Sequence, residues 1–177
     1  NSTGKLTFGY ISSSAYSGTI TVNSNVWTHV AAVRSGSTLT LYVNGVADYT
    51  NPSFGTAAIS PGTTSAVIGT KDTPYGVNYR SMTYITNLRV VTGTAIYNSP
   101  NFTPSTLPFP STQSANIYGS PSNAITGTQT SLLLTTPNNS SYLTDTSSYA
   151  QTVTGVNTPT SSSLGPSTYS GSILFNG

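Results

Sequence analysis

Two consecutive stretches of alternating apolar and polar residues constrain the fold of this chain most. Residues 26–34 read VWTHVAAVR, residues 38–45 read TLTLYVNG, and only Ser35-Gly36-Ser37 separates them. Alternation with a period of two is typical of strands that bury one face, and a short Gly-containing connection joins antiparallel strands. Asn44-Gly45 is a typical sequence for a tight hairpin turn. The sequence therefore predicts a hairpin around which further strands assemble.

Other short runs rich in β-branched and aromatic residues lie between Gly, Pro, Ser and Asn breakers. Such runs predict strands, and no stretch shows a helical period. We predict strands over residues 5–11, 19–22, 46–49, 65–70, 81–91, 131–135, 151–156 and 172–175. Residues 71–80 are predicted to form an exposed loop and residues 157–170 a loop rich in Pro, Ser and Thr. Many short strands with turn signals indicate an all-β, antiparallel β-sandwich.

Charged residues are scarce in this chain. They make up 5% of the 177 residues, against about 25% in an average domain. The formal net charge of +2 comes from five scattered basic residues, so no basic surface for nucleic acid is expected. No apolar run approaches the length of a membrane span. The chain has no cysteine, so burial alone must hold the fold together.

The hairpin carries a family resemblance. Residues 27–31 (WTHVA) followed by residues 39–45 (LTLYVNG) resemble the signature strands of laminin-G-like, concanavalin-A-like jelly rolls. Residues 66–69 and 84–90 resemble the strands that follow, although Tyr84 stands where the family often has Gly. Residues 93–109 are similar to laminin-G-like repeats of bacteriophage virion and tail-fibre proteins. The resemblance implies a noncatalytic module of a virion appendage.

The order of the pieces bears on domain organisation. In the repeats that the chain resembles, strands like those at 131–134 and 172–177 come at the start of a domain. Residues 1–110 are therefore predicted to be the C-terminal portion of a jelly roll and residues 111–130 a Ser/Thr-rich linker. Residues 131–177 are either the N-terminal strands of a next repeat or strands that complete the same sandwich. We expect a fragment of a tandem array, or alternatively a circularly permuted single domain; a start at Asn1 instead of Met suggests processing or a fragment.

The residues that could support catalysis do not form a persuasive set. Glycosidases need a pair of carboxylates, yet the chain has no glutamate, and its three acidic residues are Asp48, Asp72 and Asp145. His29 is the one histidine and lies inside the signature strand, where a structural role is favoured over a Ser-His-Asp arrangement. We expect the protein not to be an enzyme.

Binding sites are predicted at two places. Tyr75, Asn78, Tyr79 and Arg80 gather aromatic, amide and guanidinium groups in one loop, which suits a sugar or a protein partner, whereas packing on a sheet edge is the alternative. No cofactor is predicted. The resemblance implies calcium as an alternative, with Asp48 and Asp72 as its candidate ligands, although each also suits a turn.

The predicted function is a structural and adhesion module of a phage tail fibre or surface decoration, located on the virion or outside the cell. Its expected partners are other virion or filament subunits, in a homo-oligomer, and host surface glycans, with neither nucleic acid nor membrane among them. The alternative is a bacterial or archaeal cell-surface adhesin or filament subunit built from the same repeat.

Overall fold

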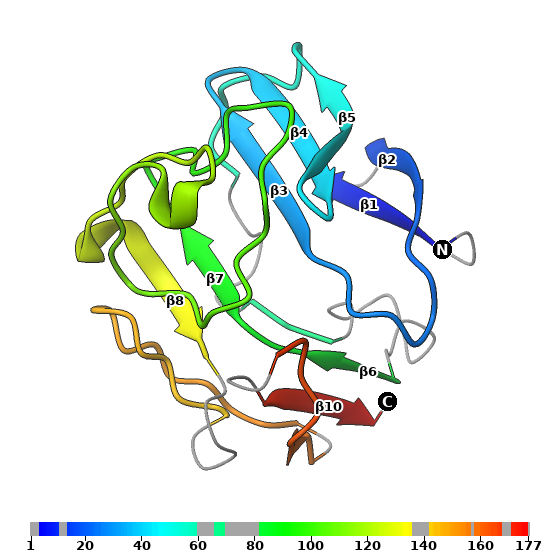
Figure 1. Cartoon of the computed structure of the whole chain (residues 1–177), viewed down its shortest axis with the longest axis vertical. Coiled ribbons are helices and arrows are strands. Elements are labelled where there is room, and N and C mark those ends of the chain that lie inside the picture. The colour runs from blue at the N-terminus through cyan, green and yellow to red at the C-terminus, as the bar shows by residue number, and fades with distance from the viewer. Residues whose placement is uncertain are drawn as a thin grey trace. The chain divides into compact units, whose positions relative to one another are not determined.

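The computed structural model describes residues 4–10, 14–59, 66–69, 82–135, 142–156, 158–167 and 171–176. These residues form antiparallel β-strands and two short 3-10 helices, which confirms the predicted all-β fold class (Figure 1). The strands are β1 (Lys5–Tyr10), β2 (Ser14–Thr21), β3 (Val30–Ser35), β4 (Thr38–Val43), β5 (Val46–Asn51), β6 (Met82–Ile85), β7 (Leu88–Val91), β8 (Thr130–Leu134), β9 (Thr160–Ser162) and β10 (Ser172–Asn176); the helices are η3 (Ile117–Gly119) and η4 (Gly127–Gln129).

The chain divides into two units, each made of several segments. The first unit contains Asn1–Ile59, Thr92–Ser105 and Thr112–Ile125. The second unit contains Ser60–Val91, Thr106–Ser111 and Thr126–Gly177. Both units therefore combine residues from early and late parts of the sequence.

The three-stranded sheet β3-β4-β5 forms the centre of the first unit (Figure 1). The turn between β4 and β5 uses positive φ angles at Asn44 (50°) and Gly45 (79°), as the sequence predicted for this pair. Leu39, Leu41 and Val43 point to one face of β4 and are 1%, 0% and 2% exposed. Burying each such side chain stabilises the fold by about 1.5–3 kcal/mol. The predicted hairpin is confirmed and supplies the core of this unit.

An aromatic cluster covers the opposite face of the same sheet. Tyr97 and Phe102 stack with ring centroids 3.6 Å apart and an interplanar angle of 5°. Tyr42 meets the Phe102 ring edge-on at 5.3 Å, and its hydroxyl donates to the Ser99 carbonyl over 3.0 Å. The backbone N–H of Phe102 also donates to the Gly45 carbonyl at 2.9 Å. Residues 97–102 are therefore packed onto the sheet.

The second unit contains two sheets, β6-β10-β9 and β7-β8. Strand β10 pairs with β6 through Leu174 opposite Tyr84, and β8 pairs with β7 through Leu132 opposite Val90. Both pairings join residues 82–91 to strands that lie at least 39 positions later in the sequence. The predicted strands at 131–135 and 172–175 are present as β8 and β10.

Several sequence predictions differ from the structure. Residues 81–91 were expected to form one strand, but β6 and β7 are separated at Thr86-Asn87, where Asn87 adopts a φ of 52°. Residues 66–69 and 151–156, predicted to be strand, have no strand in the described part of those ranges. Conversely, β9 lies inside the predicted loop 157–170. Its sequence, Thr-Ser-Ser, has no apolar alternation, and pairing with β10 selects its conformation.

Residues 111–130, predicted to be a linker, contain ordered structure. Gln113 and Ile125 form an antiparallel bridge, and both residues are buried. The buried Ser120 hydroxyl accepts a hydrogen bond from the Thr103 backbone N–H at 2.8 Å. Hydroxyl and amide side chains here bind backbone groups, which is why a polar composition does not prevent folding. The division at residues 110 and 131 stays a prediction.

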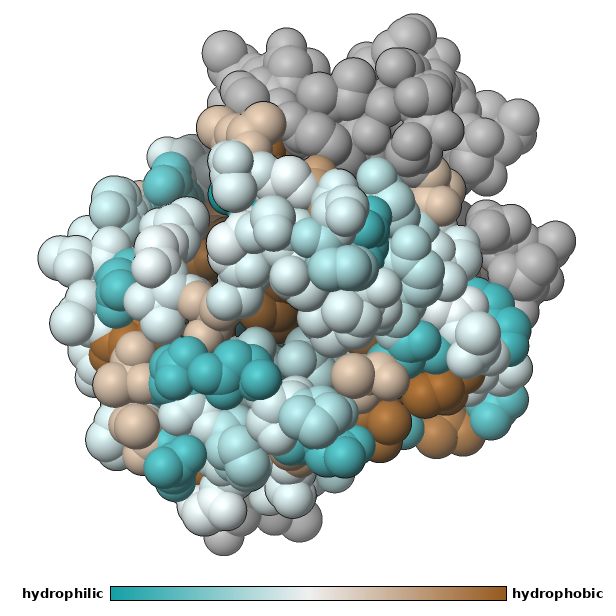
Figure 2. All heavy atoms as spheres, turned by 90° about the horizontal axis from the view of Figure 1, so that it is seen from above, coloured by the Kyte–Doolittle hydropathy of each residue, from teal (hydrophilic) through white to brown (hydrophobic). Residues whose placement is uncertain are grey.

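Residues of intermediate hydropathy dominate the molecular face seen in Figure 2. Pale and light teal residues cover most of this face, with separate brown patches of hydrophobic residues between them. The picture agrees with a composition in which only 5% of residues carry charge. In the described residues, no helix is long and apolar enough to cross a membrane.

Candidate functional site

The predicted sugar or partner site falls outside the described residues. This site consists of Tyr75, Asn78, Tyr79 and Arg80. The second candidate metal ligand, Asp72, also falls outside the described residues. The structure therefore does not test the predicted site in the 71–80 loop, which stays a prediction.

Asp48, the other candidate metal ligand, is held by hydrogen bonds to strand β2. Where β4 pairs with β5, Ala47 lies opposite Tyr42 and Tyr49 lies opposite Leu41, so Asp48 is the extra residue of a β-bulge. Its Oδ1 accepts hydrogen bonds from the Thr19 N–H at 2.7 Å, the Ile20 N–H at 2.8 Å and the Thr19 hydroxyl at 3.0 Å. The register of β1 against β2 also shifts near these two residues. The bulge thus directs a carboxylate at backbone donors of an irregular stretch of β2.

The electrostatics of Asp48 agree with this structural role. Burial opposes ionisation, but hydrogen bonds from Thr19 and Ile20, together with the charge of Lys5, outweigh it and lower the pKa of Asp48. The second oxygen, Oδ2, is buried and has no hydrogen-bond partner. Nowhere in the described residues do three or more His, Cys, Asp or Glu side chains gather as a metal site would require.

Asp145 is a second structural carboxylate, in the second unit. Its Oδ1 accepts from the Leu133 N–H at 2.8 Å and the Ser147 N–H at 2.9 Å, and its Oδ2 accepts from the Gln151 N–H and the Ser147 hydroxyl, both at 2.8 Å. Burial opposes ionisation here too, and these hydrogen bonds outweigh it, so the pKa of Asp145 is lowered. Both described aspartates therefore accept hydrogen bonds from backbone N–H groups of strands, β2 for Asp48 and β8 for Asp145.

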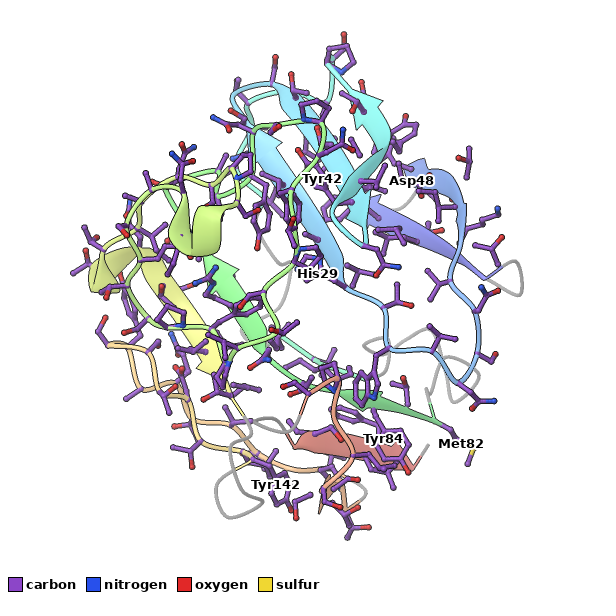
Figure 3. The ribbon with its side chains drawn as sticks, viewed as in Figure 1. His29, Tyr42, Asp48, Met82, Tyr84 and Tyr142 are labelled. Atoms are coloured by element: carbon purple, nitrogen blue, oxygen red, sulfur yellow. The ribbon has the colours of Figure 1, made fainter. Side chains whose placement is uncertain are left out.

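His29 takes part in the aromatic cluster of the first unit (Figure 3). Its ring meets Phe102 edge-on at 5.4 Å and Tyr97 at 6.1 Å, and its backbone N–H donates to Asn44 Oδ1 at 3.0 Å. These contacts place the signature histidine between the turn and the stacked rings, which favours the structural role predicted for it.

A different aromatic group lies on the other face of the central sheet. We call it the rim cluster: Phe8 on β1, Tyr16 on β2, Tyr49 on β5, and Phe54 just after β5. Phe54 meets Phe8 at 5.9 Å and Tyr16 at 5.5 Å edge-on, and Tyr16 lies 6.0 Å from Tyr49. All four side chains are half-buried. The rim cluster therefore keeps part of its aromatic surface in contact with water.

Polar groups border the rim cluster. In the described part of the chain, the hydroxyls of Tyr16 and Tyr49 form no hydrogen bond, and both residues are half-buried. Asn51 lies two residues after Tyr49 on the same face of β5, and its Oδ1 accepts from the Ser53 N–H at 3.0 Å. Its amide nitrogen remains as a donor. Rings with exposed polar tips beside an amide are the groups that bind sugars or polar peptides.

A laminin-G-type family model, described as the concanavalin A-like lectin/glucanases superfamily, matches residues 1–94, more than half of the 177 residues. The chain belongs to this superfamily. Searches of curated proteins and of solved structures gave no match. The antiparallel all-β fold of this superfamily member is consistent with a concanavalin-A-like β-sandwich.

The matched region of this concanavalin A-like protein spans β1 to β7 and includes Asp48, the rim cluster and the predicted 71–80 loop. The sequence had indicated Phe8 on an alternating strand but no relation among the four rings of the rim cluster. Phe54 lies between the breakers Pro52 and Gly55, where no strand is predicted. No sequence signal links the four positions, because the pairing of β1 with β2 and the packing of β2 against β5 bring them together.

Proposed function

We propose that this concanavalin A-like chain is a noncatalytic adhesion module that binds glycans through the rim cluster. The observation that supports it most is the contact among four half-buried rings, two of which carry hydroxyl groups, on Tyr16 and Tyr49. A sugar presents an apolar face of C–H groups and a periphery of hydroxyls, so flat rings bordered by hydroxyl and amide groups complement it. Membership of a lectin-containing superfamily supports the same function.

The chemistry of the carboxylates supports a noncatalytic role. Glycoside hydrolysis requires a general acid and a second carboxylate at the scissile bond. The chain has no glutamate, and Asp48 and Asp145 both accept hydrogen bonds from backbone N–H groups that lower their pKa values. Neither of them has the raised pKa that a general acid needs near neutral pH.

Direct binding measurements test the proposed function. The purified protein is screened on a glycan array, and the best ligand is then titrated by calorimetry against Tyr16→Phe and Tyr49→Phe. Each change removes a hydroxyl and keeps the ring, so we expect affinity to fall about 5–10-fold with little change in Tm. Tyr149→Phe is the control, because its hydroxyl donates to the Thr128 carbonyl in the second unit.

A second set of variants separates the two candidate sites. Loss of binding in Tyr75→Ala or Tyr79→Ala, with full binding in Tyr16→Phe and Tyr49→Phe, would place the ligand on the 71–80 loop instead. Absence of binding to any glycan on the array would contradict the proposed function altogether.

We also propose, from the resemblance of residues 93–109, that the module belongs to a phage virion appendage such as a tail fibre or surface decoration. The alternative is a cell-surface adhesin or filament subunit of a bacterium or archaeon. Mass spectrometry of purified virions, followed by immunogold electron microscopy, tests this assignment. Detection of the protein only on cell envelopes would favour the alternative.

A further inference from the structure

The last two strands of the family-matched region find their partners outside it. The match ends at residue 94, whereas β6 (Met82–Ile85) pairs with β10 and β7 (Leu88–Val91) pairs with β8. We call residues 126–176 the C-terminal segment; it contains β8, β9, β10 and η4. The C-terminal segment thus supplies the described strand partners of both β6 and β7.

The C-terminal segment also supplies the buried core of the second unit. In the described residues of that unit, 66–69, 82–91 and 106–111 contain no fully buried residue. The buried ones all lie in the C-terminal segment: Thr130, Leu133, Leu134, Asp145, Ser147, Pro159, Gly171, Ser172 and Ile173. Residues 82–91 therefore take their strand partners from this segment, and Arg89 also packs on the Phe109 ring and donates to the Pro110 carbonyl.

Internal contacts give the C-terminal segment an organisation of its own. Asp145 Oδ1 binds the N–H of Leu133, and the Thr146 N–H donates to the Leu133 carbonyl at 2.9 Å, so the side of β8 that faces away from β7 is occupied. Strand β9 covers one side of β10, and the Tyr142 hydroxyl donates to the Pro159 carbonyl at 3.0 Å. The edges that face β7 and β6 pair with an earlier part of the chain, and the Thr130 hydroxyl also donates to the Ser111 carbonyl at 2.7 Å.

The residues just before the C-terminal segment are fastened elsewhere. Residues 92–105 and 112–125 belong to the first unit. There the Asn123 side chain donates to the Ala95 carbonyl and its N–H donates to the Ile96 carbonyl, both at 2.8 Å. The boundary between the units falls between Ile125 and Thr126, and Thr126 has an extended backbone with φ −94° and ψ 163°. A change of the backbone angles at Thr126 would redirect the C-terminal segment.

We propose that the C-terminal segment is exchanged between two copies of this chain, with β8 and β10 of one copy pairing with β7 and β6 of the other. The exchanged form makes the same strand pairs and buries the same side chains as the closed form, so the two differ little in energy. Closed pairing within one chain has a high effective concentration, and exchange grows as protein concentration rises. Exchange would link neighbouring modules without any new surface.

Single-cysteine variants of the full chain test the exchange, because the sequence contains no cysteine. Tyr84 and Leu174 are register partners, as are Val90 and Leu132. Tyr84→Cys and Leu174→Cys proteins are mixed in denaturant, refolded together over a series of concentrations, and treated with a short thiol-bridging reagent. Val90→Cys with Leu132→Cys repeats the test on the second pairing. A covalent dimer forms only when β6 of one copy lies beside β10 of another, or, in the second test, when β7 of one copy lies beside β8 of another.

Two controls define the outcome. The Tyr84→Cys/Leu174→Cys double variant at high dilution measures how efficiently the reagent cross-links this pair of positions within one chain. The Val90→Cys/Leu132→Cys double variant gives the same measure for the pairing of β7 with β8. Leu174→Cys mixed with Thr50→Cys, an exposed position of the first unit, reports random collision. We expect dimer yields that rise with concentration and exceed the collision control about tenfold. Yields equal to that control for both register pairs would overturn the proposal.

Discussion

At the scale of single residues, Asp48 shows how one side chain joins two irregular strands. A bulge in β5 turns the carboxylate toward β2, and the shifted register of β2 leaves the Thr19 and Ile20 N–H groups to bind it. Hydrogen bonds of this charged kind are worth more than neutral ones, about 1.5–3 kcal/mol each. The bulged residue therefore fixes the β1–β2 hairpin on the central sheet.

Gly18 is the residue that gives the Asp48 carboxylate its space. A Cβ at position 18 would lie 1.7 Å from Asp48 Oδ2 and 2.4 Å from its Cγ. We expect Gly18→Ala to displace the carboxylate and lower the free energy of unfolding by about 2–4 kcal/mol, measured by urea denaturation. Gly9→Ala on the neighbouring strand is the matched control, since nothing lies within 4 Å of its added Cβ. Equal stability of the two variants would contradict this role of Gly18.

Asp145 gives the protein a predicted acid sensitivity. Its pKa is lowered in the folded state, so the stability it contributes is present above its unfolded pKa of about 3.9 and is lost as pH falls through the folded pKa. At pH 7 we expect Asp145→Asn to lower the free energy of unfolding by about 1–3 kcal/mol. Between pH 5 and pH 2, the Tm of this variant should fall less than that of the native protein. Calorimetric scans of both proteins over that pH range measure the two Tm curves. Parallel curves would contradict the predicted acid sensitivity.

At the scale of elements, Asn87 explains why one predicted strand became two. The 81–91 stretch is rich in strand-forming residues, and its composition gives no reason for a break. A φ of 52° at Asn87 interrupts the ladder, so β6 pairs with β10 and β7 with β8. The break distributes one stretch between two sheets.

Substitutions at Asn87 test this geometry. A β-branched residue is strained at positive φ, so we expect Asn87→Val to lose about 1–2 kcal/mol of unfolding free energy. Asn87→Gly should equal or exceed the native stability, because Gly adopts this φ freely and the change removes a buried Oδ1 that has no partner. Thermal melts of both variants decide the matter. A Val variant as stable as the Gly variant would argue against the left-handed conformation.

At the scale of the whole molecule, the shortage of charge sets the solution behaviour. Only 5% of residues are charged, so hydroxyl and amide groups provide most of the polar surface. We expect the Tm to change by less than about 3 °C between 20 mM and 500 mM sodium chloride, since screening acts on charged groups. Differential scanning fluorimetry over a salt series measures it. A larger shift would mean that the few charges contribute more than their number suggests.

The sequence alone determined the hairpin of β3 and β4, the Asn44-Gly45 turn, the strands β8 and β10, and the superfamily. These features depend on local alternation and turn chemistry, which neighbouring residues encode. The structural role of His29 followed from the same signature. Sequence reasoning placed the candidate sugar site at Tyr75, Asn78, Tyr79 and Arg80, a loop outside the described residues.

Only the tertiary structure decided which strands are partners and which side chains meet. The four rings of the rim cluster meet because β1, β2 and β5 fold together, and no local pattern contains that information. Contacts between distant parts of the chain also explain the polar strand β9, the break at Asn87 and the binding of Asp48 to β2. Strand pairing and burial depend on contacts between residues far apart in the chain, and their energies outweigh the local preferences that a sequence shows.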